Sequence, residues 1–237
     1  MIRVMLERGS GAAGQRGRLL DGEAHHLRVR RAEAGESVEV RDGEGLVGSG
    51  RLVRAGKSWG VELISAELAP RGMDLTLAVG AGDRDRFTWV VEKATELGVT
   101  SVIPLECERT AGVASRLRAQ HLERLRRQAL EAVKQSGAAW AARVEEPMSL
   151  GTLAGRPIAG KGWVADGGGA PVPALLGDNP LTIVIGPEGG LTAAELERLR
   201  GAGYRPVSLG PHTLRFETAA IAAAAGAVAA RLRGSDG

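Results

Sequence analysis

The sequence is poor in the residues that build metal centres and disulfide frameworks. Its 237 residues include one cysteine, Cys107, and four histidines. A single cysteine excludes an internal disulfide framework and is typical of a reducing compartment, so we expect a cytoplasmic protein. It also excludes a zinc site of clustered cysteines. The histidines, of which His25 and His26 are adjacent, show no metal-ligand spacing, so we expect no metal.

Aromatic residues and long apolar runs are also scarce. Aromatics make up 3% of the chain, too few for a platform on which single-stranded RNA stacks. No run of about 18 apolar residues is present, so no membrane span is expected. The start, MIRVMLERGSG, lacks the apolar core of a signal peptide and is interpreted as the mature start.

Basic residues are in only slight excess over acidic ones. There are 31 basic against 28 acidic residues, a formal net charge of +3. A basic protein can bind nucleic acid, but this excess is weak evidence for it. The abundance of glycine, alanine and arginine is equally well explained by the base composition of the gene.

The first 68 residues are predicted to form a small barrel of β-strands. The stretch 37–55 is two candidate strands, one on each side of the turn signals Asp42-Gly43 and Gly45, and 58–68 is another candidate strand. One short helix is expected from Glu23 to Gly35.

After a linker at 70–72, apolar strands alternate with helical patterns. This alternation predicts an α/β domain with a parallel sheet. We expect a short flexible stretch at GGGAP, residues 167–171. Strands are expected at 73–79, 99–105, 161–165, 181–185 and 205–209, and helices at 87–97, 116–135, 192–200 and 216–232.

The stretch TIVIGPEGGLTAAELE, residues 182–197, joins an apolar strand to a helix through a glycine-rich loop. Thr192 and Glu195 have the spacing of a capping box, so the loop should lie at the carboxyl end of a parallel strand, where α/β folds bind ligands. It lacks the lysine and hydroxyl of a phosphate loop. Glu188 would repel an anion by about 4 kcal/mol at about 4 Å and an effective dielectric near 20, which favours a neutral or cationic ligand. The alternative is a tight turn with one solvated glutamate.

A second Gly-Pro loop occurs in SLGPHTLRFETAAIAAAA, residues 208–225, again after a strand. It is followed at a helix start by Arg215, Glu217 and Thr218. Two such loops at neighbouring strand ends are predicted to line one pocket. The alternative for Arg215 and Glu217 is a solvated ion pair, which contributes little to stability.

Four blocks of the sequence resemble the SPOUT superfamily of knotted methyltransferases. They are IGPEGGLTAAELE, LGPHTLRFETA, EKATELGVTSVIPLECERT (92–110) and HHLRVRRAEAGESVEVRDGEG (25–45). Together they are similar to the ribosomal RNA small subunit methyltransferase E family, which methylates uridine N3 in 16S ribosomal RNA. The resemblance implies a PUA-like RNA-binding barrel at 1–69 and a SPOUT domain with a deep trefoil knot and mainly parallel sheet at 73–234.

The same resemblance implies S-adenosylmethionine as cofactor, and a homodimer formed through the knotted domain in which the partner completes the site. The acidic loop is compatible with a cationic sulfonium. The implied cofactor-binding residues are Ala165, Asp166, Ile185, Gly186, Pro187, Glu188, Gly189, Leu209, Gly210, His212, Leu214 and Arg215.

For catalysis, the N3 proton of uridine must leave, so a base or an anion-stabilising cation is needed. Arg215 is the candidate for the cation, and Glu217 for orienting it or taking the proton. Basic side chains are expected to hold ribosomal RNA, free or within the small subunit, although the basic 116–134 helix is equally explained as a solvated face. The candidate RNA-binding residues are Arg3, Arg16, Arg18, Arg28, Arg30, Arg31 and Arg109.

Two positions depart from the family pattern and leave alternatives open. Asp83 stands about where a lysine is usual, and Ala138 follows the QSG at 135–137 where an arginine is usual. One alternative is a SPOUT methyltransferase that acts on another RNA. The other is a non-catalytic RNA-binding factor for ribosome assembly.

Overall fold

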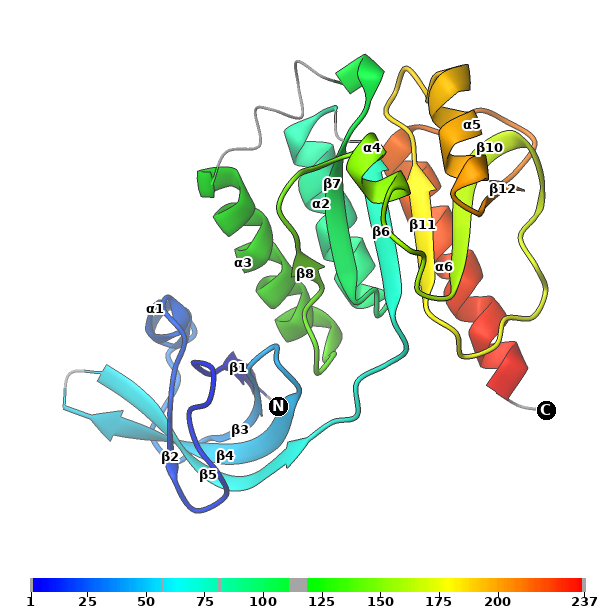
Figure 1. Ribbon diagram of the computed structural model, residues 1–237. Helices are drawn as coiled ribbons and strands as arrows, with labels where there is room; N and C mark the ends of the chain where they lie inside the picture. Colours follow the sequence, from blue (N-terminus) through cyan, green and yellow to red (C-terminus); the bar gives the residue numbers. More distant parts are fainter. Residues whose placement is uncertain (1, 57, 81, 111–118, 236–237) are drawn as a thin grey trace. The chain divides into compact units, whose positions relative to one another are not determined.

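The chain divides into two compact units in a computed structural model that describes residues 2–56, 58–80, 82–110 and 119–235 (Figure 1). One unit comprises Met1–Arg71 and Leu130–Ala141, and the other Gly72–Ala129 and Ala142–Gly237. The sequence places the domain boundary at 69–73 but gives no signal that 130–141 joins the first unit. Hydrogen bonds from the Arg3 guanidinium to the carbonyls of Lys134 and Gln135, at 2.6 and 3.2 Å, help to hold that segment there.

The N-terminal unit is a five-stranded sheet in the order β1-β3-β4-β5-β2. A β-bridge between Leu6 and Leu19 links the ends of the two edge strands, so the sheet closes on itself as the predicted barrel does. The strands are β1 (Ile2–Met5), β2 (Arg16–Arg18), β3 (Ser37–Arg41), β4 (Leu46–Ala55) and β5 (Ser58–Leu68).

Alternate residues of these strands fill the barrel, as a strand periodicity of two requires. Val38, Val40 and Leu52 are fully buried. Helix α1 (Glu23–Val29) adds Leu27 to the same cluster. The expected end of this helix at Gly35 is wrong.

Helix α1 ends early because the backbone turns left-handed. Arg31 has a φ of 56°, and the Ala32 amide donates to the Leu27 carbonyl at 2.9 Å. This bond satisfies one of the carbonyls that a helix end leaves free. Arg30 forms the C-cap and stays exposed.

The C-terminal unit is built on a seven-stranded parallel sheet, ordered β12-β10-β11-β6-β7-β8, with β9 also paired to β7. Its central strands are apolar because helices cover both faces. The predicted parallel α/β sheet is confirmed, while the knotted chain path stays a prediction. The strands are β6 (Leu75–Gly80), β7 (Ser101–Glu106), β8 (Arg143–Val144), β9 (Met148–Ser149), β10 (Lys161–Pro171), β11 (Leu181–Ile185) and β12 (Tyr204–Ser208).

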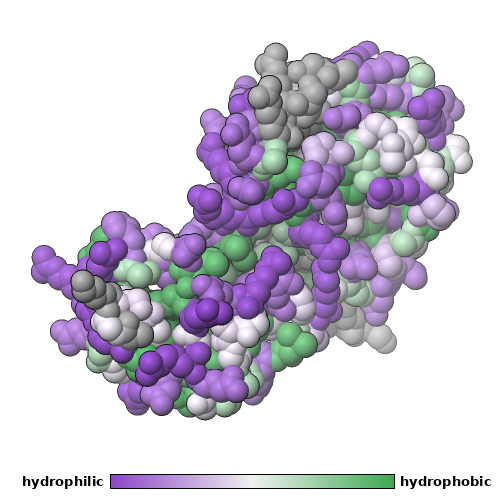
Figure 2. All heavy atoms as spheres, turned by 60° about the vertical axis from the view of Figure 1, so that its left-hand side comes forward, coloured by the Kyte–Doolittle hydropathy of each residue, from purple (hydrophilic) through white to green (hydrophobic). Residues whose placement is uncertain are grey.

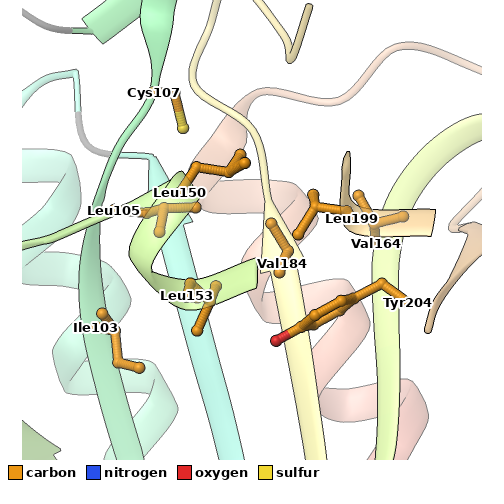
Figure 3. Packing of buried hydrophobic residues seen from close by; sticks show 10 residues of the cluster. Ile103, Leu105, Cys107, Leu150, Leu153, Val164, Val184, Leu199 and Tyr204 are labelled. Carbon is orange, nitrogen blue, oxygen red and sulfur yellow. The ribbon is translucent and has the colours of Figure 1, made fainter. Parts of the chain in front are cut away.

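Helices α2 (Arg84–Glu96) and α6 (Phe216–Ser235) lie on one face of this sheet, and α4 (Leu150–Ala154) and α5 (Ala193–Gly201) on the other (Figure 1). Figure 3 shows Leu150 and Leu153 of α4 facing the buried side chains of Leu105 and Val184. Helix α3 runs over Ala119–Ser136, and its expected start at Arg116 lies outside the described residues.

The GGGAP stretch is not a flexible loop but the second half of β10, so that expectation is wrong. β10 changes register against β12 between Ala165 and Ala170 and then pairs again. Glycine is required at 169, because a Cβ there would lie 2.5 Å from the Val207 amide nitrogen. Gly169 thus allows the close approach of the two strands.

Hydrophilic side chains cover most of the face shown in Figure 2, with smaller hydrophobic areas between them. Within the described ranges, no helix combines the length and apolarity that crossing a membrane requires.

Candidate functional site

A cavity of about 640 Å³ lies within the C-terminal unit, where β10, β11 and β12 give way to their loops. Its volume falls in the usual range for small-molecule sites, and its place at strand carboxyl ends is where parallel sheets bind ligands. The two Gly-Pro loops both line it, so they meet as predicted. All the residues proposed for the cofactor except Arg215 line this cavity.

Other residues that line the cavity lie within the quoted sequence stretches but were not predicted to bind the cofactor. Phe216 and Ala219 contribute from the first turns of α6. The remaining ones are Gly167, Gly190, Leu191, Leu196, Ser208, Pro211 and Thr213.

The loop after β11 is held tightly against the end of β6. A Cβ on Gly80 would lie 2.7 Å from the nitrogen of Pro187, a contact that side chains do not make. A Cβ on Gly82 would overlap the Glu188 carboxylate. Pro187 is buried, and Gly190 has a φ of 67°, which favours glycine. The loop therefore packs closely against the end of β6 and Gly82.

Side chains on two other segments tie down the far end of this loop. The Arg109 guanidinium donates to the Gly189 carbonyl. One oxygen of Glu195 accepts from the Glu108 amide at 2.8 Å, and the other accepts from the Thr192 amide at 2.8 Å. The predicted capping box between Thr192 and Glu195 is present. Glu195 is 8% exposed, so its carboxylate bridges two backbone segments in the interior.

The cavity is electrostatically suited to a neutral or cationic ligand. Asp166 and Glu188 are among its lining residues, and His212 is exposed. Asp166 accepts from the Gly168 amide at 3.0 Å, and its other oxygen lies 3.5 Å from Arg200. In the part of the chain that the structure describes, no three His, Cys, Asp or Glu side chains are grouped as metal ligands.

The two candidate catalytic residues are placed differently from each other. Arg215 is exposed beside the cavity, between the lining residues Leu214 and Phe216. The side chain of Glu217 is 13% exposed, and its Oε1 lies 3.5 Å from Nη1 of Arg86. Its Oε2 is buried and has no hydrogen-bond partner among the described residues. Arg86 is therefore the partner of Glu217 in the structure.

The role of Arg86 was not predicted, although the sequence placed it near the departure at Asp83. Asp83 is the N-cap of α2, and its carboxylate accepts from the Arg86 amide at 2.9 Å. The aspartate thus begins the helix that carries the arginine. Although Asp83 stands where the family usually has a lysine, a cation remains nearby, because Arg86 lies on the first turn of α2.

The candidate RNA-binding residues fall in both units. Arg16 and Arg18 on β2, and Arg28, Arg30 and Arg31 at and after α1, are exposed. Arg3 is partly buried and paired with Glu39 at 3.0 Å. Arg109 belongs to the C-terminal unit, where it contacts the loop after β11. Their contacts with RNA stay a prediction.

Comparison with known proteins gives matches over both units. Residues 69–228 match the model of an RNA methyltransferase domain, and 19–58 that of an RNA methyltransferase PUA domain. Ribosomal RNA small subunit methyltransferase E of Aquifex aeolicus is 32% identical, covering 87% of this chain and 93% of its own. The enzyme of that name from Bacillus subtilis is 30% identical, covering 84% of each.

A solved structure has a similar fold over nearly the whole chain. It is a ribosomal RNA small subunit methyltransferase E from Neisseria gonorrhoeae bound to S-adenosylmethionine. The TM-score is 0.82 at 26% identity, and the alignment covers 95% of each chain.

Proposed function

The chain belongs to the ribosomal RNA small subunit methyltransferase E family, and from this we propose that it uses S-adenosylmethionine to methylate N3 of a uridine in 16S ribosomal RNA. The observation that carries the proposal is the cavity at the ends of β10, β11 and β12. Three loops that the family resemblance assigns to the cofactor line it together. A relative of the same fold holds that cofactor.

The residues of the cavity fit S-adenosylmethionine. The glycines of the loop after β11 expose backbone amides and carbonyls that can hold an adenine, and Asp166 and Glu188 are compatible with a positive charge. When bound, the cofactor supplies an electrophilic methyl group on its sulfonium. Because that methyl group is already reactive, positioning by the three loops accounts for much of the catalysis.

Removal of the N3 proton is the chemical task left to side chains. Arg215, exposed beside the cavity, stabilises the negative charge that develops on the uridine. Glu217 orients Arg215 or takes the proton, and Oε2 is the oxygen available for either role. Arg86 holds the other oxygen of Glu217.

The proposed assembly is a homodimer through the knotted domain, with ribosomal RNA, free or in the small subunit, as substrate. The small side chains of α6 support close packing of helices there: Ala222, Ala225 and Ala229 are only half-buried within one chain. The PUA-domain match and the exposed arginines at β2 and α1 support an RNA-binding role for the N-terminal unit.

The test is mass mapping of small-subunit ribosomal RNA from a strain that lacks the gene. We expect one uridine without its methyl group, restored by the wild-type gene and restored poorly by Arg215→Ala. Full complementation by Arg215→Ala would remove that residue from the mechanism. A normally methylated ribosomal RNA in the deletion strain would contradict the proposed substrate.

Calorimetry with S-adenosylmethionine separates the enzyme from a binding factor that has only kept the fold. We expect the purified protein to bind the cofactor. Absence of binding at millimolar cofactor would favour the assembly-factor alternative.

A further inference from the structure

A second cavity, of about 340 Å³, lies in the N-terminal unit, apart from the residues already assigned to the cofactor. Its polar walls come from β1, α1 and the end of α3, and Leu27 supplies apolar surface. The volume is at the lower end of the roughly 300–1,000 Å³ that small-molecule sites occupy. Its charged and hydrogen-bonding residues are Arg3, Glu23, His26, Arg30, Lys134 and Gln135.

The buried wall of this cavity is fixed by ion pairs and hydrogen bonds. Glu23 is 3% exposed, and its Oε1 lies 2.7 Å from Nζ of Lys134. The same ammonium is 3.0 Å from Nδ1 of His26. Arg3 is paired with Glu39 and donates to the Lys134 carbonyl, so each of these cations has a partner.

Arg30 differs from the other cations of the cavity. It is exposed, and the described residues include no hydrogen-bond or ion-pair partner for its side chain. Since Glu23 and Glu39 offset Lys134 and Arg3, the guanidinium of Arg30 is the uncompensated charge. A ligand with one anionic group would complete the balance.

We propose that this cavity binds a single unstacked nucleotide of the RNA substrate, with its phosphate on Arg30 and its base against His26. Guanidinium groups bind phosphate through paired hydrogen bonds. Proteins that recognise single-stranded RNA hold splayed bases against imidazole and other flat groups. A solvated basic face would present the same charge without a hollow lined by apolar and imidazole surface.

This inference rests on the proposed function, because it assumes an RNA substrate, but it adds a nucleotide subsite to the barrel. Its base-binding side chain is His26, which the sequence marked only as part of a family pattern. Lys134 joins the site from the segment 130–141, which folds with the barrel.

The first test measures binding of a uridine-containing RNA oligonucleotide to the full chain by fluorescence anisotropy. Arg30→Ala should raise Kd about tenfold, the effect of about 1.4 kcal/mol, and reduce the slope of log Kd against log salt by about 0.7. Arg8→Ala is the matched control, because Arg8 is an exposed arginine of the same unit that pairs with Glu44 and does not line the cavity. Equal effects of the two substitutions would overturn the proposal.

The second test uses uridine 5′-monophosphate as a probe and the imidazole signals of the histidines as the readout. Millimolar nucleotide should move the signal of His26 and leave that of the exposed neighbour His25 in place. An unmoved His26 signal would contradict the subsite. Neither test depends on catalysis. If the wild-type protein bound RNA but never methylated it, the proposed function would be refuted and the proposed subsite would not.

Discussion

The two cavities described above are lined by different kinds of groups. The loops of the C-terminal cavity are held by close glycine contacts with Pro187 and Glu188 and by backbone amides that donate to the carboxylate of Glu195. The N-terminal cavity is shaped by charged side chains around the Glu23–Lys134 pair. A backbone-built site fixes one ligand shape, whereas a site of charged side chains binds anionic groups with little regard to sequence. This difference fits the proposed ligands: a small cofactor in the C-terminal cavity and a long RNA at the N-terminal one.

The largest expected effect is that of Glu217→Gln, which should slow methyl transfer without weakening the binding of cofactor or of RNA. Glu217→Gln keeps the size of the side chain but removes the charge that pairs with Arg86 and, in the proposed mechanism, the carboxylate that orients Arg215 or takes the proton. We expect the methylation rate at saturating substrates to fall about a hundredfold, the lower end for loss of a general base. Affinities for cofactor and RNA should change little. The measurement is single-turnover methyl transfer with a radiolabelled methyl group.

Glu197→Gln is the matched control for this substitution. Glu197 is an exposed glutamate of α5 that pairs with Arg200 and is outside the cavity. The control should methylate at the wild-type rate. If Glu217→Gln does so as well, neither catalytic role of Glu217 survives.

The second prediction tests whether backbone contact shapes the C-terminal cavity. Gly80→Ala places a Cβ against the nitrogen of Pro187 and must displace the loop after β11. Overpacking of this kind costs about 1–3 kcal/mol. We expect cofactor affinity to fall about tenfold or more, and RNA affinity, which depends on charge, to remain. Calorimetry with S-adenosylmethionine and anisotropy with RNA measure the two.

Gly177→Ala provides the comparison, because a Cβ on Gly177 would have no atom within 4 Å and its φ is not positive. It should bind cofactor as wild type does. Wild-type affinity in Gly80→Ala would mean that the loop adapts, and the contrast between the two cavities would lose its physical basis.

The sequence predicted the C-terminal cavity better than the contacts around it, for a physical reason. Apolar strands followed by Gly-Pro turns, and a capping box at Thr192, are local patterns, and the loops lie where those patterns put them. The pair between Arg86 and Glu217 and the bonds from Arg3 to the end of α3 join segments far apart in the chain. Neither leaves a local periodicity to detect.

Two local expectations failed, one at the end of a helix and one in a glycine-rich stretch. Helix α1 ends at Val29, although no glycine or proline stands before Gly35, because Arg31 adopts the left-handed conformation. GGGAP has the composition of a linker, yet pairing with β12 makes it part of a strand. Glycine content alone does not distinguish a flexible segment from one that needs close approach.

The smallest expected effect concerns the interior behind the C-terminal cavity. Cys107 is 3% exposed, and burial, with a smaller contribution from the charge of Glu195, raises the pKa of its thiol to about 12. Because the folded pKa lies above the ordinary value of 9.0, the thiol stays protonated at neutral pH. Since the thiolate is the reactive form, a thiol reagent should label the folded protein very slowly and the unfolded protein at once.

The raised pKa of Cys107 also determines how the free energy of unfolding changes with pH. Between the unfolded pKa near 9.0 and the folded pKa of about 12, the unfolded chain binds fewer protons at this site than the folded one. The contribution of Cys107 to the free energy of unfolding is therefore complete below pH 9 and is lost as the pH rises towards 12. As the chain has one cysteine, thiol labelling reports on Cys107 alone. Urea unfolding of wild type and of Cys107→Ala, compared across this pH range, isolates the contribution of Cys107 to the pH dependence of stability. Rapid labelling of the folded protein at neutral pH would show that the structure around Cys107, between β7 and Glu195, opens readily. The C-terminal cavity would then be less rigid than its close contacts imply.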